Sequence, residues 1–160
     1  MFRRLFLGAA AGAAGTTALH AATYLDMALR ARPASGTPER TVAKMADAQG
    51  IDIPGEGEER DNRLAGLGPL SGIATGVAVG VGYGLLDMLH LRPRGLAGTL
   101  LAGGGAMALS NATMTKYGVT DPTTWTAKDW LSDVVPHLVY GAVLSSTYSS
   151  AVDAVAECTS

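Results

Sequence analysis

The sequence lacks most of the features that would indicate catalysis, metal binding or nucleic-acid binding. Its single cysteine, Cys158, excludes an intrachain disulfide, and its position does not fit a C-terminal prenylation box. The net charge is −2 and no basic stripe is present, so no nucleic-acid partner is indicated. There is no nucleophile elbow, no histidine pair at zinc spacing and no phosphate loop between a strand and a helix. We therefore expect a protein that is not an enzyme and that holds neither a metal nor a cofactor.

Charge is missing from four long stretches of the chain. With histidine counted as neutral, no charged residue occurs in residues 5–25, 64–86, 95–115 or 134–152. Each stretch is long enough for a membrane-spanning helix, which needs roughly 17 to 25 residues. The sequence thus predicts an all-α fold, with residues 1–160 forming one integral membrane domain in a lipid bilayer. Its four-helix transmembrane bundle is expected to have helices at about 5–29, 64–90, 95–116 and 127–155.

Five glycines recur at four-residue spacing in the second charge-free stretch: Gly68, Gly72, Gly76, Gly80 and Gly84. In a soluble helix each would cost about 1 kcal/mol relative to alanine. In lipid the helix keeps its backbone hydrogen bonds, and small residues at this spacing let a neighbouring helix approach closely. We expect these glycines to form a helix-packing ridge. Similar rows of small residues in the other stretches favour a compact bundle over a wide pore.

The two halves of the chain resemble each other weakly. A shift of ninety residues superimposes Gly8 on Gly98 and Gly15 on Gly105. A true duplication would make the fold two helix hairpins in parallel repetition, related by an axis along the membrane normal. The pair Arg3-Arg4 ahead of an apolar run also resembles a twin-arginine export signal. We favour a retained first helix, because cleavage would remove one quarter of the repeat.

The only long polar segment is the first connection, at about residues 30–63. Within it Thr37 is expected to be an N-cap and Pro38 the first helical residue of a short amphipathic helix that stops at Gly50. The apolar side of this helix is modest. We expect the helix to lie on the bilayer surface or on the bundle.

The last connection carries a signal for the start of a helix. Thr126 and Asp129 form a variant of the capping box, which predicts that the fourth long helix begins at Ala127. Trp125 and Trp130 flank this signal, and their amphipathic rings suit the headgroup boundary.

Polar side chains inside the predicted spans are the candidate functional residues: His20, Tyr24, Asn111, His137 and Tyr140. Ionisable groups at membrane depth are costly and point to function, and histidine titrates near neutral pH. Two interpretations stay open, namely neutral imidazoles that bridge helices by hydrogen bonds and a proton- or ligand-linked site. Metal binding is disfavoured because no third ligand has a suitable spacing.

Charged residues also gather at the end of the second predicted span. Asp87 and His90 lie there beside Arg92 and Arg94, and we expect an ion cluster at the membrane interface.

The C-terminal part of the chain resembles YagU-type bacterial inner-membrane proteins. The likeness rests on Gly118-Val119-Thr120-Asp121-Pro122, Trp130 and His137-Leu138-Val139-Tyr140. It implies a small multi-pass inner-membrane protein with a loose link to acid tolerance. It carries over His137 and no catalytic residue.

Two functional hypotheses follow. In the first, the chain is a non-enzymatic multi-pass protein that acts by helix association with itself, as a homo-oligomer, or with a larger membrane complex. In the second, it is a small proton-linked or solute conduit built around His20, Asn111, His137 and Tyr140.

Overall fold

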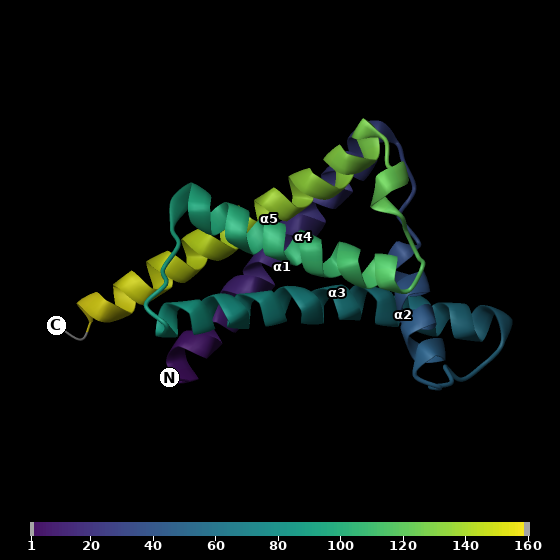
Figure 1. Cartoon of the computed structure of the whole chain (residues 1–160), viewed down its shortest axis with the longest axis horizontal. Helices are drawn as coiled ribbons and strands as arrows, with labels where there is room; N and C mark the ends of the chain where they lie inside the picture. The colour runs from purple at the N-terminus through teal and green to yellow at the C-terminus, as the bar shows by residue number, and fades with distance from the viewer. Residues whose placement is uncertain (1, 159–160) are drawn as a thin grey trace.

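The chain folds into helices only, throughout the part that the computed structural model describes, residues 2–158. The helices are α1 (Phe2–Arg30), α2 (Thr37–Ala48), α3 (Gly57–Met88), α4 (Gly95–Lys116) and α5 (Ala127–Glu157), with a 3₁₀ turn at Pro122–Thr124 (Figure 1). The all-α class is therefore confirmed for these residues.

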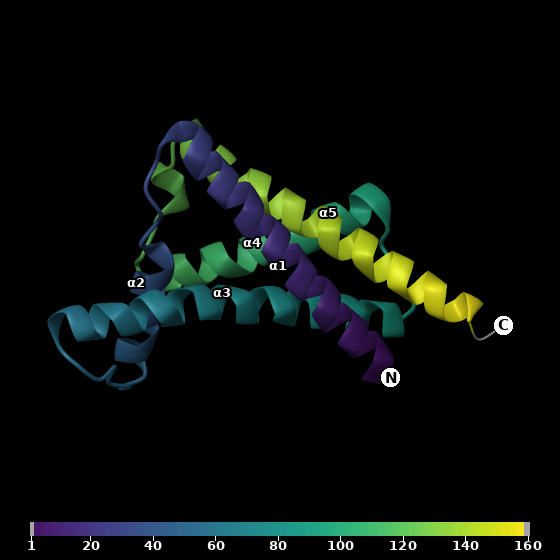
Figure 2. The same ribbon diagram turned by 180° about the vertical axis from the view of Figure 1, so that it is seen from behind.

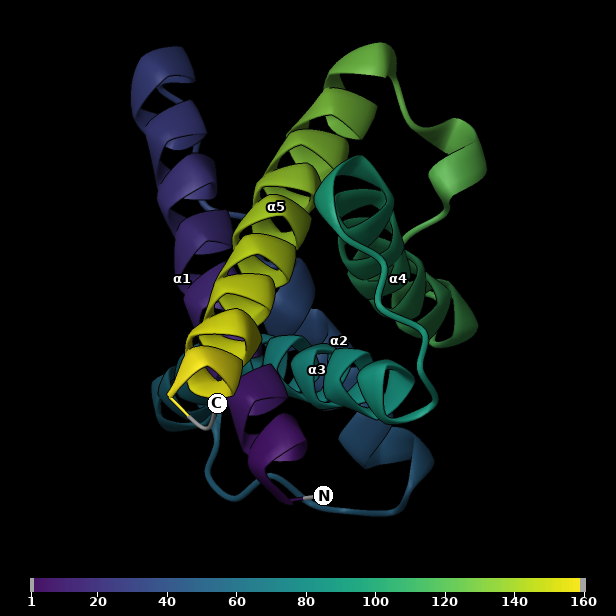
Figure 3. The same cartoon turned by 90° about the vertical axis from the view of Figure 1, so that its left-hand side faces the viewer.

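The four long helices run back and forth between two ends of the molecule. The start of α1, the α3–α4 turn and the end of α5 lie at one end, which faces the viewer in Figure 3. The α1–α2–α3 connection and the α4–α5 connection lie at the other end (Figure 1). Helix α1 packs against α3 and α5, and α4 packs against α5 (Figure 2). Helices α3 and α4 share few contacts, so the bundle is held mainly by the other three pairs of long helices.

Helix α1 meets α3 backbone to backbone through glycines. A methyl group at Gly12 would come within 2.5 Å of the Gly76 carbonyl oxygen and 3.1 Å of the Gly80 Cα. A methyl group at Gly80 would lie 2.7 Å from the Gly12 Cα and would also collide with the Gly8 carbonyl. The crossing of α1 and α3 therefore depends on the absence of side chains at these positions.

Helices α4 and α5 also meet backbone to backbone through glycines. A methyl group at Gly141 would lie 2.6 Å from the Gly103 nitrogen, and one at Gly103 would collide with the His137 carbonyl. Each half of the chain thus forms a hairpin of two long helices joined through glycines. In a true duplication, the contact between α1 and α5 would correspond to a contact between α4 and α3. The first contact is extensive and the second is small, so the duplication stays a prediction.

Helix α3 begins at Gly57, well before the expected start near Leu64. Glu58 and Glu59 lie in its first turn, where negative charge is stabilised by the helix dipole. The absence of charge therefore marks the apolar part of this helix and not its full length.

Helix α2 begins one residue earlier than expected. Gly36 is its N-cap, and the Ser35 hydroxyl accepts the Thr37 N–H over 3.2 Å. The helix lies on the first turns of α3, where a methyl group at Gly68 would come 2.9 Å from the Glu39 nitrogen. The polar connection is thus docked on the bundle.

Two of the helices, α1 and α3, are long and apolar enough to cross a membrane. Only 28% of the residues in the most apolar window of α1, and 22% in that of α3, are buried. Helices α4 and α5 are not apolar enough over that length, so the four expected spans are not confirmed. Glycine, serine and threonine take the place of aliphatic residues in these two helices.

Candidate functional site

Two of the expected polar residues, Asn111 and His137, are joined through a third residue, Asp133. The Asn111 side-chain amide on α4 donates to Asp133 Oδ2 on α5 over 2.8 Å. The His137 ring nitrogen Nδ1 lies 2.7 Å from the Asp133 carbonyl oxygen and 3.3 Å from its Oδ1. Asp133 was missed because it stands one residue before the last charge-free stretch. Its four-residue spacing to His137 was the available signal.

Two polar atoms of this cluster have no partner among the described residues. A carbonyl can only accept, so Nδ1 of His137 carries a proton, and Nε2 makes no hydrogen bond to any residue in the described part of the chain. The Oδ1 atom of Asn111 is buried and has no hydrogen-bond partner among the described residues. A water or another proton donor between α4 and α5 would satisfy that oxygen.

Tyr140 is buried elsewhere and ties helices together. Its side chain is 1% exposed, and its hydroxyl donates to the Gly76 carbonyl of α3 over 2.6 Å. Its ring also covers α1, because a methyl group at Gly15 would lie 2.8 Å from the ring. Tyr140 therefore acts in packing, and within residues 2–158 no hydrogen bond joins it to His137.

His20 and Tyr24 form a separate pair on α1. Their ring centroids are 6.0 Å apart, and Tyr24 is 61% exposed. Neither ring makes a hydrogen bond to any residue in the described part of the chain. The five expected residues therefore lie in three places and do not form one site.

The five glycines of the predicted helix-packing ridge do not all face the same neighbour. Gly76, Gly80 and Gly84 lie against α1, and Gly68 lies against α2. A methyl group at Gly72 would meet no neighbouring atom within 4 Å. Four glycines thus face helices of the same chain, and one faces outward.

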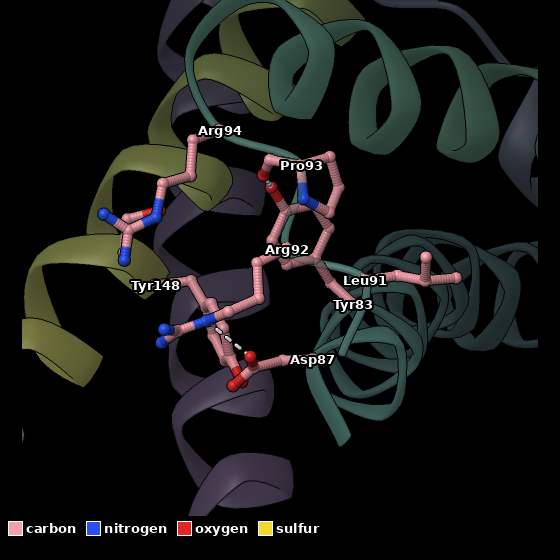
Figure 4. A pocket seen from close by; sticks show the side chains of 8 residues that line it. Tyr83, Asp87, Leu91, Arg92, Pro93, Arg94 and Tyr148 are labelled. Carbon is pink, nitrogen blue, oxygen red and sulfur yellow. Dashed lines mark hydrogen bonds and ion pairs between the residues drawn. The ribbon is translucent and has the colours of Figure 1, made fainter. Parts of the chain in front are cut away.

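The most buried charged group of the described chain is Asp87 of α3, which is 2% exposed. Arg4 Nε lies 3.3 Å from its Oδ2. Arg92 Nε lies 2.5 Å from its Oδ1, and the Tyr148 hydroxyl donates to Oδ2 over 2.9 Å (Figure 4). Arg4 also donates to the Asp87 carbonyl over 3.0 Å. One carboxylate thus joins α1, α3, α5 and the α3–α4 turn. We call Asp87, Arg4, Arg92 and Tyr148 the Asp87 cluster.

The sequence indicated an ion cluster around Asp87 but not its burial or all of its members. Arg4 is 83 residues away along the chain, and no local pattern links the two. His90, which was expected to take part, is exposed and has a positive φ of 63°.

The Asp87 cluster is positively charged overall. Two guanidinium groups share one carboxylate, and this leaves one positive charge without a counter-charge. Arg92 is close to Oδ1 but is not aligned for a hydrogen bond, so this oxygen has no hydrogen-bond donor among the described residues. Removing either member of a buried pair is costly, because the remaining charge stays desolvated.

Two tyrosines hold the turn that carries Arg92. The Tyr83 hydroxyl donates to the Pro93 carbonyl, and its ring packs edge-on against Tyr148 at 5.5 Å between centroids. Arg94, two residues further, pairs with Asp153 of α5 over 2.6 Å. The positions of Arg92 and Arg94 are therefore fixed by contacts to α3 and α5.

The acidic residues of the last connection are stabilised in their charged form. The side chain and the N–H of Thr123 donate to Asp121 and lower its pKa. Thr126 donates to Asp129 in the same way and lowers the pKa of that carboxyl. The reciprocal bond from Asp129 N–H to Thr126 completes the expected capping box, and α5 begins at Ala127 as predicted.

Within residues 2–158, no group of three or more His, Cys, Asp and Glu side chains is placed to hold a metal ion. A comparison with protein-family models, with curated proteins and with solved structures finds no match for the chain. The candidate sites therefore rest on their geometry.

Proposed function

We propose that the chain is a non-enzymatic multi-pass membrane protein that works through helix–helix association. The observation that carries the proposal is the distribution of side chains between the inside and the outside. The buried cluster consists of alanines, one leucine and three tyrosines: Ala11, Ala102, Ala106, Leu144, Tyr83, Tyr140 and Tyr148. The exposed side includes many large apolar side chains, among them Phe6, Leu70, Ile73, Leu85, Leu100, Leu101, Leu109 and Leu131.

This distribution suits lipid better than water. A soluble monomer rarely exposes an apolar patch larger than a few hundred Å². Acyl chains solvate leucine and phenylalanine well, while close packing of small residues and interhelical hydrogen bonds hold the helices together. The resemblance to YagU-type proteins supports the bacterial inner membrane as the location.

Open space beside several glycines of α3 and α4 supports association with a second chain. Helices α3 and α4 share few contacts, and several of their glycines have open space beside them: Gly66, Gly72, Gly82, Gly104 and Gly105. Small residues on an outer helix face allow a partner helix to approach its backbone. The partner would be a second copy of this chain or a helix of a larger membrane complex.

Association is tested by the mass of the purified protein in detergent. We expect an oligomer, and we expect Gly104→Leu with Gly105→Leu to shift it to the monomer while the helix content stays the same. The matched control is Leu101→Ile, which keeps the bulk on the same helix. A wild-type protein that is monomeric in mild detergent and in bilayers, and that captures no membrane protein, would contradict the association.

A second candidate function is proton-linked transport, and the Asn111–Asp133–His137 cluster favours it. A carboxylate, an imidazole with a free Nε2 and an unpaired amide oxygen lie together between α4 and α5. Reconstituted vesicles with an internal pH dye would test this function. Equal proton flux for the wild type, Asp133→Asn and His137→Ala would remove the basis for it.

A further inference from the structure

We infer that Arg92, Arg94 and Ser149 bind the phosphate of an anionic phospholipid headgroup at the end of the bundle where the α3–α4 turn lies. The inference rests on the membrane placement proposed above. It concerns a cleft lined by Tyr83, Asp87, Leu91, Arg92, Pro93, Arg94, Tyr148 and Ser149 (Figure 4). The cleft is shallow, with a volume of about 10 Å³, and it opens to solvent, so a phosphate would lie at its mouth.

The end of the molecule that carries the α3–α4 turn has an excess of positive charge. Arg4 and Arg92 share the carboxylate of Asp87, so one of their two positive charges is not compensated. Arg94 is balanced by Asp153, and Arg3 at the same end is exposed and makes no ion pair among the described residues. Glu157 at the end of α5 is a further acid at this end, so four arginines face three carboxylates, and the excess of one positive charge favours an anion.

Arg92 and Arg94 both have N–H donors that no described residue uses. Arg92 approaches Asp87 through Nε, and its two terminal nitrogens make no hydrogen bond within residues 2–158. Arg94 uses one terminal nitrogen for Asp153 and keeps Nε and the other nitrogen free. Both guanidinium groups point to the same side of the cleft in Figure 4. Guanidinium groups with paired free N–H donors match phosphate oxygens well.

Ser149 supplies a neutral donor in the same cleft. Ser149 lines the cleft from α5, and its hydroxyl makes no hydrogen bond to any residue of the described chain. A phosphate held between Arg92 and Arg94 would therefore also lie near Ser149. Asp87, which lies deeper, is already covered by two guanidinium groups and repels such a phosphate weakly.

The surroundings of the cleft distinguish a lipid from free phosphate. The turn joins α3 and α4 at the end of the molecule where α1 begins and α5 ends, which is the level of the headgroups if the helices span the bilayer (Figure 1). Exposed apolar side chains stand next to the arginines along the chain and at the start of α1: Phe2, Leu89, Leu91 and Leu96. Acyl chains would cover these side chains, whereas inorganic phosphate would leave them in water. Basic pockets between spanning helices are known to bind anionic headgroups.

The test uses full-length protein purified in mild detergent and exchanged into vesicles of phosphatidylcholine with or without phosphatidylglycerol. The readout is the amount of phosphatidylglycerol retained per protein after delipidation, measured by mass spectrometry. We expect selective retention by the wild type and a loss of about fivefold for each of Arg92→Gln and Arg94→Gln, the effect of one cation at an anionic surface. Ser149→Ala, which leaves every ion pair in place, should weaken retention by a smaller factor.

Arg40→Gln is the matched control, because Arg40 is exposed on α2 at the opposite end and should not change retention. If millimolar inorganic phosphate displaces the lipid from the wild type, the site is a free-phosphate site and the lipid assignment is wrong. Equal retention by the wild type and by the Arg92→Gln/Arg94→Gln double variant, with both folded and in the membrane fraction, overturns the inference alone. A wild type extracted from membranes by alkaline carbonate would overturn the proposed function as well.

Discussion

The hydroxyl of Tyr140 on α5 donates a hydrogen bond of 2.6 Å to the carbonyl oxygen of Gly76 on α3. The ring of Tyr140 lies over Gly15 of α1 on the way. Three long helices therefore meet at one side chain. The contact is possible because the glycines at both partner positions leave room for the ring.

Replacing Tyr140 tests this junction. Tyr140→Phe keeps the ring and removes the hydrogen bond, so we expect a loss of about 1 kcal/mol in the free energy of unfolding. Tyr140→Ala also removes the ring and should cost about 3 to 5 kcal/mol. Unfolding by SDS in mixed micelles measures both. Tyr24→Phe is the control and should have no effect, since Tyr24 is 61% exposed and makes no hydrogen bond within the described chain.

Two glycines of the predicted helix-packing ridge, Gly80 and Gly72, should differ sharply in how an alanine substitution changes stability. Gly80→Ala places a methyl group 2.7 Å from the Gly12 Cα, so α1 and α3 must separate, at a cost of about 1 to 3 kcal/mol. Gly72→Ala meets nothing within 4 Å and should leave stability unchanged or slightly raised. The same SDS titration compares them. Equal effects of the two substitutions would show that α1 does not pack on this ridge.

The Asp87 cluster should be sensitive to loss of its carboxylate. Asp87→Asn leaves Arg4 and Arg92 without their shared counter-charge, and we expect a loss of about 3 to 5 kcal/mol. Asp153→Asn breaks the Arg94 pair, whose two side chains are each 48% exposed, and should cost about 0 to 1 kcal/mol. Thermal unfolding in detergent measures the difference. A similar small loss in both variants would mean that the Asp87 pairs are not desolvated.

The capping box predicts a dependence on acid. The hydroxyl and N–H of Thr126 lower the pKa of Asp129 from its usual value of 3.8, so the folded form binds the proton less readily than the unfolded form. The stabilisation is complete above the unfolded pKa and is lost as the pH falls through the lowered folded pKa. We expect the first turn of α5 to fray below about pH 4, where Trp125 and Trp130, 5.0 Å apart, would report it by fluorescence. Asp129→Asn should abolish this acid transition, and its persistence in that variant would assign the transition to another group.

The sequence predicts local features of this fold better than contacts between residues far apart in the chain. The long helices were predictable because a charge-free stretch of about twenty residues usually forms a helix. The capping box of α5 was predictable because Thr126 and Asp129 are three residues apart. The start of α3 was not, since Glu58 and Glu59 extend the helix outside its apolar part.

The candidate site shows the same division. The sequence predicts Asn111 and His137 as site residues, and Asp133, which joins them, has a local signal in its four-residue spacing to His137. The pairing of Arg4 with Asp87 has none, because it depends on how α1 crosses α3. Only side-chain chemistry links His20 with His137 in the sequence. The rotation of α1 about its axis decides whether the two meet, and the glycines that contact α3 set that rotation.

The central claim is that the exposed apolar side chains of this bundle lie in lipid, and cysteine accessibility tests it most directly. Cys158, which is exposed, is first replaced by serine. Single cysteines are then placed at Ile73 and Leu101, which are exposed in the bundle, and at Arg40 on α2. In intact membranes we predict that a charged maleimide labels Arg40→Cys from one side and leaves Ile73→Cys and Leu101→Cys unlabelled until SDS is added. Rapid labelling of Ile73→Cys and Leu101→Cys at the rate of Arg40→Cys, without SDS, would contradict the account.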